Sequence, residues 1–403
     1  MRISAVWTVL AAALSSPLSG AAQALPSEPV RVFDGRLVLT GEAVGTAGEA
    51  DHEGYFNYTG YERNALRMVR LSLAAQWQPV DRVALIAEVR SENFAEPGAY
   101  AAYVRVRPWR RRSLDIQAGR IPPVFGAFGR RSYTSDRLLV GYPLAYQYLT
   151  SLRPESAPAT ADDLLRMRAR GWRASFPLGE SSAGPGVPLI SAFQWDTGVQ
   201  ARIHTERTEM ALAVTTGTLS SPRVSDDNDG KQISARVAVR PVTGLSLGAS
   251  AARGGWLSRT VPTLDAHRRY TQTAAGADAE YSRDHWLIRG EMVWSRWRLP
   301  FSAVPVEGPS VEALASWIEG RYRVSPRWYV AGRADRLGFS RVTSTIAGRP
   351  PTPWDAPVVR IETGFGYYLR RNVIARASLQ WNDRDGGRVT TRRFLSGQVA
   401  YWF

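Results

Sequence analysis

Arginine and tyrosine residues gather in one part of this sequence, within a connection that spans residues 121–190. Guanidinium groups are interleaved there with phenols, and both groups donate hydrogen bonds to anions. In a narrow, partly dehydrated passage such groups would attract anions and bind them. Together with the arginine that precedes the connection, the candidate residues are Arg120, Arg130, Arg131, Tyr133 and Arg137. A solvated extracellular loop is the alternative interpretation.

The sequence contains few residues that could form disulfides, metal sites or catalytic sites. The chain has no cysteine, which excludes disulfides, thiolate metal sites and cysteine nucleophiles. None of its four histidines lies near a glycine-flanked serine. The segment Asp226–Gly230 resembles a calcium loop, but position twelve of its frame is Arg236, which cannot coordinate a cation. We therefore expect no catalytic residues, no metal site and no cofactor.

The charge of the chain is strongly basic, with 51 Lys+Arg against 36 Asp+Glu and a formal net charge of +15. Such a charge often indicates nucleic-acid binding. The N-terminus points elsewhere, because Arg2, an apolar run over residues 5–14 and the sequence Ala22-Gln23-Ala24 are typical of a cleaved signal peptide. The run is too short for a membrane anchor. We expect a signal peptide over 1–24 and an exported domain over 25–403, with no nucleic-acid partner.

The exported part is built from segments of about ten residues in which apolar residues alternate with polar ones. Val69, Leu71 and Leu73 share one face, for example, while Arg70 and Ser72 share the other. A period of two with charge on one face predicts β-strands with one face in water. Sixteen strands are expected near 31–45, 64–78, 82–92, 100–108, 112–120, 191–203, 207–218, 231–240, 244–256, 270–281, 285–297, 312–324, 327–340, 357–369, 372–383 and 391–403.

The breaks between these strands alternate between short and long. Short turns on one side and long loops on the other are the layout of an outer-membrane barrel. The fold class is therefore all-β, a transmembrane antiparallel β-barrel of sixteen strands whose long third extracellular loop folds into the lumen. Eighteen strands would result if Arg168–Pro177 and Val187–Phe193 paired within that loop. A soluble β-sandwich or β-helix is the competing interpretation.

Aromatic residues favour the barrel, because they collect at both ends of the strands as in the interfacial belts of membrane barrels. Trp77 and Trp286 lie beside short turns, while Trp256, Trp294 and Trp297 lie beside long loops. At the end of the chain, Tyr401 and Phe403 share one face. This ending resembles the signal by which outer-membrane barrels are recognised for insertion.

A barrel of sixteen strands leaves an aqueous lumen rather than a core filled by side chains. Strand parity predicts that arginines and carboxylates both face this lumen, so the wall is mixed in charge. The inward arginines taken as candidate selectivity residues are Arg70, Arg90, Arg105 and Arg107. Further inward residues by the same parity include Arg289, Arg333, Arg360, Glu291, Asp335 and Glu362. Within the long connection, residues 160–170 predict a short capped helix.

Two segments resemble a known family. Gly119-Arg120-x-Pro-Pro-x-Phe-Gly126 and Asp196-Thr-Gly-Val-Gln200 are similar to motifs of phosphate-selective porin O/P-type channels. The resemblance implies a trimeric, anion-selective outer-membrane channel of sixteen strands. The family's phosphate ladder relies on lysines, whereas Lys231 is the only lysine here. Arginine supplies the charge without the compact ammonium geometry.

From these features we expect a water-filled diffusion channel in the outer membrane, with modest anion preference and without high-affinity phosphate binding. Its expected partners are outer-membrane lipid, small anionic or phosphorylated solutes, two further copies in a homotrimer, and the barrel-assembly machinery during insertion. The alternative is a non-conducting outer-membrane barrel that serves adhesion or structure, or that carries an enzyme site.

Overall fold

The computed structural model describes residues 29–51, 56–58, 64–109, 113–129, 133–192, 194–263, 265–300, 310–386 and 392–403. The expected signal peptide over 1–24 lies outside these residues. In the part of the chain that is described, no helix is long and apolar enough to cross a membrane.

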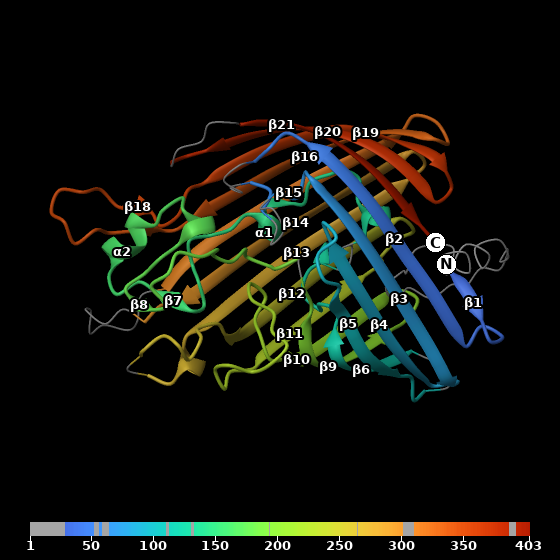
Figure 1. Cartoon of the computed structure of the whole chain (residues 1–403), viewed down its shortest axis with the longest axis horizontal. Coiled ribbons are helices and arrows are strands. Elements are labelled where there is room, and N and C mark those ends of the chain that lie inside the picture. The colour runs from blue at the N-terminus through green and yellow to red at the C-terminus, as the bar shows by residue number, and fades with distance from the viewer. Residues whose placement is uncertain are drawn as a thin grey trace, which may run out of the picture.

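Sixteen long strands form one closed antiparallel β-barrel (Figure 1). Each long strand pairs with the next along the chain, and the last, β21, pairs with the first, β2, so the sheet has no free edge. The strands are β2 (Leu37–Gly48), β3 (Met68–Val80), β4 (Val83–Glu92), β5 (Gly98–Val106), β6 (Leu114–Ile121), β9 (Asp196–His204), β10 (Thr208–Thr215), β11 (Gln232–Val239), β12 (Leu245–Gly255), β13 (Thr271–Arg283), β14 (Trp286–Arg298), β15 (Ser310–Arg323), β16 (Trp328–Phe339), β19 (Val358–Arg370), β20 (Val373–Arg384) and β21 (Arg393–Trp402).

The predicted strand count is confirmed, with one error at the start. Residues 31–45 are not a single strand, because β1 (Val30–Val32) folds back on the beginning of β2. The reversal occurs where Phe33 and Asp34 both adopt a φ of 54°, a left-handed conformation that ends an extended strand.

The eighteen-strand alternative is wrong. Between β6 and β9, the described residues form only two short strands, β7 (Ser156–Ala157) and β8 (Leu178–Gly179), which pair with each other. The predicted capped helix is confirmed as α2 (Ala161–Arg166), where Thr160 and Asp163 form a capping box.

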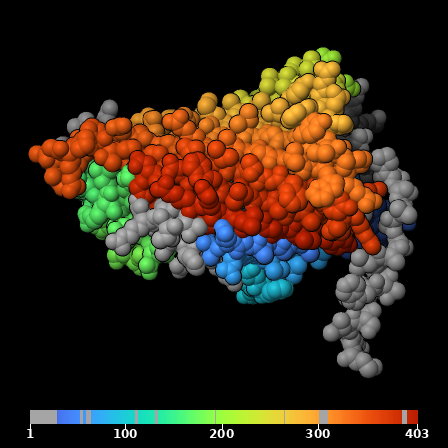
Figure 2. Space-filling view, turned by 90° about the horizontal axis from the view of Figure 1, so that it is seen from above, coloured from blue at the N-terminus to red at the C-terminus, as the bar shows by residue number. Residues whose placement is uncertain are grey.

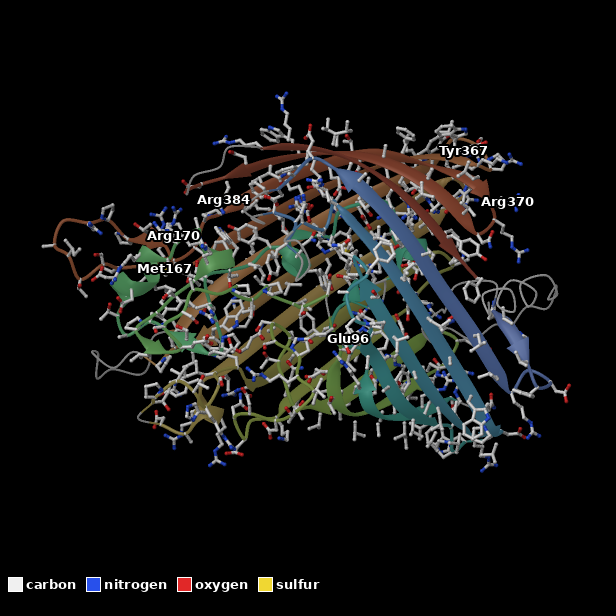
Figure 3. All side chains as sticks on the ribbon, viewed as in Figure 1. Glu96, Met167, Arg170, Tyr367, Arg370 and Arg384 are labelled. Atoms are coloured by element: carbon white, nitrogen blue, oxygen red, sulfur yellow. The ribbon has the colours of Figure 1, made fainter. Side chains whose placement is uncertain are left out.

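The two ends of the barrel differ as predicted. The long connections, including β7, β8, α2 and the β17 (Arg341–Val342) and β18 (Thr352–Pro353) hairpin, lie at one end, and the C-terminus lies at the other (Figures 1 and 2). Tyr367 and Arg370 at a short turn are correspondingly far from Met167 and Arg170 in the longest loop (Figure 3).

The faces of the wall differ as strongly as its ends. On the outer face, Leu73, Leu212 and Ile318 are 49 %, 54 % and 57 % exposed. On the inner face, alternate residues such as Arg333 and Glu362 are buried. The outer face is therefore apolar, whereas the inner face carries charged residues together with an apolar cluster that includes Val311, Ala315 and Trp317 of β15.

The aromatic belts are confirmed at the short-turn end, where Trp77 and Trp286 lie exposed on the outer face. The prediction is wrong for two residues at the long-loop end, because Trp256 and Trp297 are buried. Trp297 lies three residues after the outward-facing Trp294, an odd spacing that turns it to the inner face. Trp256 follows the end of β12, and its indole donates a hydrogen bond to the carbonyl oxygen of Arg298 at 2.9 Å.

The C-terminus closes the barrel seam. The backbone groups of Phe403 and Gly41 exchange hydrogen bonds of 3.1 and 3.2 Å. The Phe403 ring covers Gly41 so closely that a Cβ atom at position 41 would lie 2.5 Å from it. Tyr401 lies beside Phe403, with ring centroids 6.2 Å apart. Their role as an insertion signal stays a prediction.

Candidate functional site: the inner wall and the long loop

The loop between β6 and β9, which we call the long loop, packs against the polar inner face of the wall. Over residues 133–154 every residue except Ser135 and Asp136 is buried. Aromatic residues contribute much of this packing, as where the Phe128 ring lies 4.9 Å from the Tyr146 ring and 5.9 Å from the Trp317 ring of β15. The interior beneath the long-loop end is therefore packed as tightly as a protein core.

Carboxylates of the inner wall hold the backbone of the long loop. The Gly141 amide donates to Glu362 of β19 at 2.9 Å, and the Leu144 amide donates to Asp335 of β16 at 3.2 Å. Further loop groups donate to strands β2, β4, β12 and β14: the Thr134 amide to Glu42, the Tyr133 hydroxyl to Glu88, the Gly126 amide to Ser250 and the Ala127 amide to Glu291. These hydrogen bonds alone join the long loop to the inner face of six strands.

Arginines of the inner wall hold the carbonyl groups of the same loop. Each of three guanidinium groups donates to a loop carbonyl oxygen at 3.1 Å: Arg289 to Asp136, Arg333 to Gly141 and Arg360 to Tyr142. The wall therefore binds both the amide and the carbonyl group of Gly141, which satisfies the backbone of this buried residue.

The Arg333 guanidinium is the centre of an ion-pair network. It lies 2.6 Å from Glu362, 2.9 Å from Asp335 and 3.5 Å from Glu319, and all four side chains are almost fully buried. Buried charges are tolerated only when paired and hydrogen-bonded, and here each has such partners.

Gly141 is a glycine because of this close approach. A Cβ atom at position 141 would lie 2.2 Å from the amide nitrogen of Gln380 and 2.6 Å from a carboxylate oxygen of Glu362. Any side chain at this position would therefore require a shift of the long loop or of the buried Gln380 and Glu362 side chains.

Four of the predicted selectivity residues form one cluster. Arg70 donates to the Tyr142 hydroxyl at 3.0 Å, and the Arg137 guanidinium lies 4.3 Å from the centre of the Tyr142 ring. Arg90 pairs with Glu88 at 3.0 Å, and Glu88 accepts the hydrogen bond from Tyr133. The structure therefore brings Arg70, Arg90, Tyr133 and Arg137 together, near Tyr142, another of the tyrosines in the long loop.

Two pKa shifts describe the electrostatics of this cluster. Burial opposes ionisation of Tyr142, but the charges of Arg137, Arg70 and Arg90 together lower its pKa. Burial and the Glu88 carboxylate raise the pKa of Tyr133, so that its hydroxyl stays protonated and donates to Glu88. The potential at Tyr142 is therefore positive.

Two other predicted residues lie on the wall outside this cluster. The Arg105 guanidinium donates to the side chain of Gln76 at 3.0 Å, and Arg107 pairs with Asp115. Arg130 and Arg131 lie outside the described residues, so their roles stay predictions.

The prediction that Arg120 is a selectivity residue of the lumen is wrong. It is paired across the sheet with Ala102, an exposed residue of the outer face, and its guanidinium donates to the carbonyl oxygens of Trp195 and Ala99. Asp115 of the same strand faces inward. Arg120 follows it at an odd spacing along the strand, and therefore faces outward. Arg120 therefore does not join the arginines of the lumen.

The sequence analysis missed the residues that hold the long loop. Parity had identified Arg333, Arg360, Asp335 and Glu362 as inward-facing, but nothing distinguished them from other inward charges. Their contacts join positions about 200 residues apart along the chain, and such a distance carries no local pattern.

In the described part of the chain, no three His, Cys, Asp or Glu residues lie where they could hold a metal ion. The segment that resembles a calcium loop has a structural contact instead. The Asn228 side chain donates to the carbonyl oxygens of Gly255 and Leu257 at 3.0 and 3.1 Å, which ties two loops together.

No protein-family model matches the chain, and no curated protein matches it in sequence. Solved structures do match in fold. Outer-membrane expressed OmpT of Vibrio cholerae superposes with a TM-score of 0.56 at 10% identity, over 93% of this chain and 100% of that chain. An anion-selective porin from Comamonas acidovorans superposes with a TM-score of 0.52 at 9% identity, over 91% and 99%. The chain therefore has the fold of porin-like outer-membrane barrels, while the resemblance to phosphate-selective O/P channels stays a prediction.

Proposed function

We propose that this protein is an outer-membrane channel for the diffusion of small solutes, and that the long loop occupies and narrows its lumen. The observation that carries the proposal is the hydrogen bonding of the long loop to the inner face of six strands. A sixteen-stranded barrel is wide enough for an aqueous channel, and the charged inner face supports water and ions rather than lipid. The exported chain resides in the outer membrane as a homotrimer and has no enzymatic activity.

The preferred solutes in this proposal are small or phosphorylated anions. Support comes from the positive potential at Tyr142, where Arg70, Arg90 and Arg137 converge. The preference is modest, because inner carboxylates such as Glu88 and Glu92 pair with Arg90 and Arg70 and offset their charge. In a narrow lumen the remaining charge still acts strongly, since little water screens it.

A second candidate function has its own support. The burial of almost all residues over 133–154 favours a barrel in which the long loop is a plug and no solute passes. Such a protein would serve adhesion or envelope structure.

Conductance across planar lipid bilayers separates the two candidates. A channel is expected to give discrete conductance steps, and reversal potentials in asymmetric KCl are expected to show modest anion preference. The double substitution Asp335→Asn with Glu362→Gln weakens the contacts that hold Gly141 and Leu144, and should increase the conductance. The matched control is Asp383→Asn, since Asp383 is exposed and pairs with Arg392 away from the long loop. Absence of steps in both the wild type and the double variant, with heat-modifiable gel migration intact, would favour the plugged barrel.

A further inference from the structure

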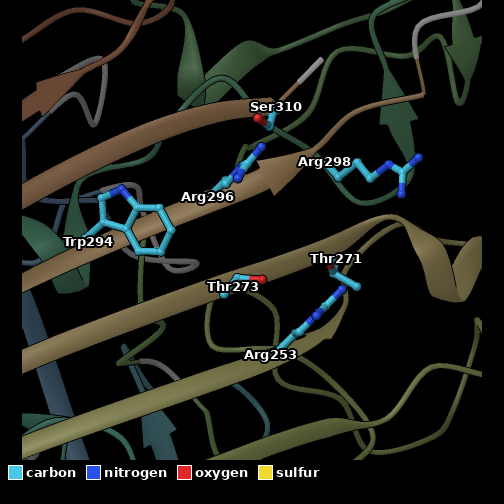
Figure 4. Close-up of a pocket in the computed structure, with 7 residues that line it drawn as sticks. All are labelled: Arg253, Thr271, Thr273, Trp294, Arg296, Arg298 and Ser310. Carbon is cyan, nitrogen blue, oxygen red and sulfur yellow. The ribbon is translucent and has the colours of Figure 1, made fainter. Parts of the chain in front are cut away.

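A hollow on the outer face of the barrel has a composition unlike the rest of that face. It measures about 520 Å³ and is lined by three arginines, Arg253, Arg296 and Arg298, from strands β12 and β14 (Figure 4). Arg253 and Arg296 are exposed on the same face as the apolar residues Leu247 and Met292. The hollow therefore lies outside the lumen, where the wall otherwise presents apolar side chains.

The strand register places these arginines side by side. Arg253 is opposite Thr273, and Thr273 is opposite Arg296, so the three residues form one row across β12, β13 and β14. Neighbouring strands lie about 4.8 Å apart, which separates the Cα atoms of the two arginines by about 10 Å. Two side chains of this length can reach a single anion above the threonine between them. Arg298 lies one row further from the membrane, opposite Ser310.

The outer face of β14 shows where this row lies in the membrane. From the short turn it runs Trp286, Ile288, Gly290, Met292 and Trp294 before it reaches Arg296 and Arg298. The two tryptophans mark the limits of the apolar band. Eight residues of a strand tilted as in membrane barrels span roughly 20 Å along the membrane normal, close to the height expected of that band. The arginines therefore lie at the headgroup level on the long-loop side.

Among the described residues, only one carboxylate lies beside this positive charge. Within the described residues, the only ion pair of the three arginines joins Arg296 to Glu312 at 3.8 Å, and the Glu312 carboxylate also accepts a hydrogen bond from the Trp294 indole. Three inner arginines, Arg70, Arg90 and Arg333, by contrast, each have a carboxylate at 2.6 to 3.0 Å. Three guanidinium groups and one carboxylate leave a hollow that favours an anion.

The surface on the membrane side of the arginines favours an acyl chain. The next residues on the outer faces of β12 and β13 are alanines, namely Ala251, Ala249, Ala275 and Ala277, all of them exposed. We call these four residues the alanine strip. Their side chains are small, and the larger Met292 and Trp294 side chains of β14 lie opposite Ala277 and Ala275. A site for an anion next to a surface for a hydrocarbon chain fits a molecule that carries both groups.

We propose that this hollow binds the phosphate-bearing headgroup of an outer-leaflet lipid, with an acyl chain of the same lipid on the alanine strip. Guanidinium groups bind phosphate oxygens in a bidentate manner, and the hydroxyls of Thr271, Thr273 and Ser310 can donate to the remaining oxygens. The Trp294 indole lies at the interface, where it contacts both headgroup and chain. The inference rests on the proposed outer-membrane location and is independent of conductance.

Lipid binding by the purified full-length mature protein tests the proposal. Native mass spectrometry with diphosphoryl lipid A is expected to show retained lipid on the wild type. The triple variant Arg253→Gln, Arg296→Gln and Arg298→Gln is expected to bind about a hundred-fold more weakly, because each arginine near a phosphate-rich surface contributes separately. The matched control replaces Arg283, Arg327 and Arg370, exposed arginines at the short-turn end, with glutamine, and should bind as the wild type does.

Three further arms separate the sources of the anion. Dephosphorylated lipid A should bind the wild type weakly, no better than diphosphoryl lipid A binds the triple variant. Inorganic phosphate should not displace diphosphoryl lipid A from the wild type. Displacement by inorganic phosphate would identify a site for free anions and overturn the proposal. Equal lipid binding by the wild type and the triple variant would overturn it too. The same holds for a triple variant whose oligomeric state changes while its lipid binding does not. Bilayer conductance of the triple variant should equal that of the wild type, which keeps this test separate from that of the channel.

Discussion

The arginines of the inner wall and those of the outer hollow are chemically identical, yet their surroundings differ completely. Arg333 is buried among three carboxylates and donates to a carbonyl oxygen of the long loop. Arg296 on the outer face is half exposed, and its one described ion pair is 3.8 Å long. A guanidinium that is buried without partners is costly, whereas one at the headgroup level is hydrated or bound by lipid phosphate. The face of the strand therefore decides whether an arginine supports the fold or remains available to a ligand.

This difference changes what the net charge of +15 means. Much of the inner positive charge is neutralised by inner carboxylates, so the lumen is less positive than the composition indicates. In the described part of the chain, the three arginines of the outer hollow have one carboxylate partner between them, Glu312. Net charge alone is thus a poor guide to the selectivity of the channel.

The largest expected effect comes from removing an inner arginine. Arg333→Ala leaves the buried carboxylates of Glu319, Asp335 and Glu362 without their shared partner, which should cost about 3–5 kcal/mol. We expect a clearly lower temperature for the shift in heat-modifiable gel migration. Arg253→Ala in the outer hollow should leave that temperature unchanged. Equal effects of the two substitutions would contradict the contrast between the two faces.

A smaller effect is expected from a single methyl group in the long loop. Gly141→Ala places a Cβ atom against Gln380 and Glu362, and overpacking of this kind costs about 1–3 kcal/mol. The loop should yield rather than the wall, so we expect higher conductance and faster proteolysis within residues 133–154. The control is Gly45→Ala on the outer face of β2, where a Cβ atom would meet nothing within 4 Å. Unchanged conductance and proteolysis in Gly141→Ala would show that the contact with the wall is not tight.

The sequence was sufficient for the barrel, because a period of two is a local property that each strand displays by itself. The same parity correctly turned Arg70, Arg90 and Arg333 inward, and applied strictly it would have turned Arg120 outward and Trp297 inward. The hairpin at Phe33 and Asp34 was missed although Asp34-Gly35 is a dipeptide typical of tight β-hairpin turns, because the apolar alternation on both sides was read as one strand. The path of the long loop could not be predicted, since it depends on contacts such as that of Gly141 with Glu362, which only the closed barrel brings together.

The most direct test of the account asks whether the long loop lies against the inner wall. The Leu139 side chain and the Cβ atom of Ser378 on β20 each lie 3.0 Å from the position that a Cβ atom at Gly364 would take, so the two side chains are within about 6 Å (3.0 + 3.0) of each other. The chain has no native cysteine to interfere. In a protein carrying Leu139→Cys with Ser378→Cys, a short bifunctional thiol reagent applied to intact outer membranes should join the two positions and change migration on a denaturing gel. The control pair, Leu139→Cys with Gly45→Cys on the outer face, should not join. Failure of the first pair to join, or equal joining of both pairs, would contradict a long loop held inside the barrel.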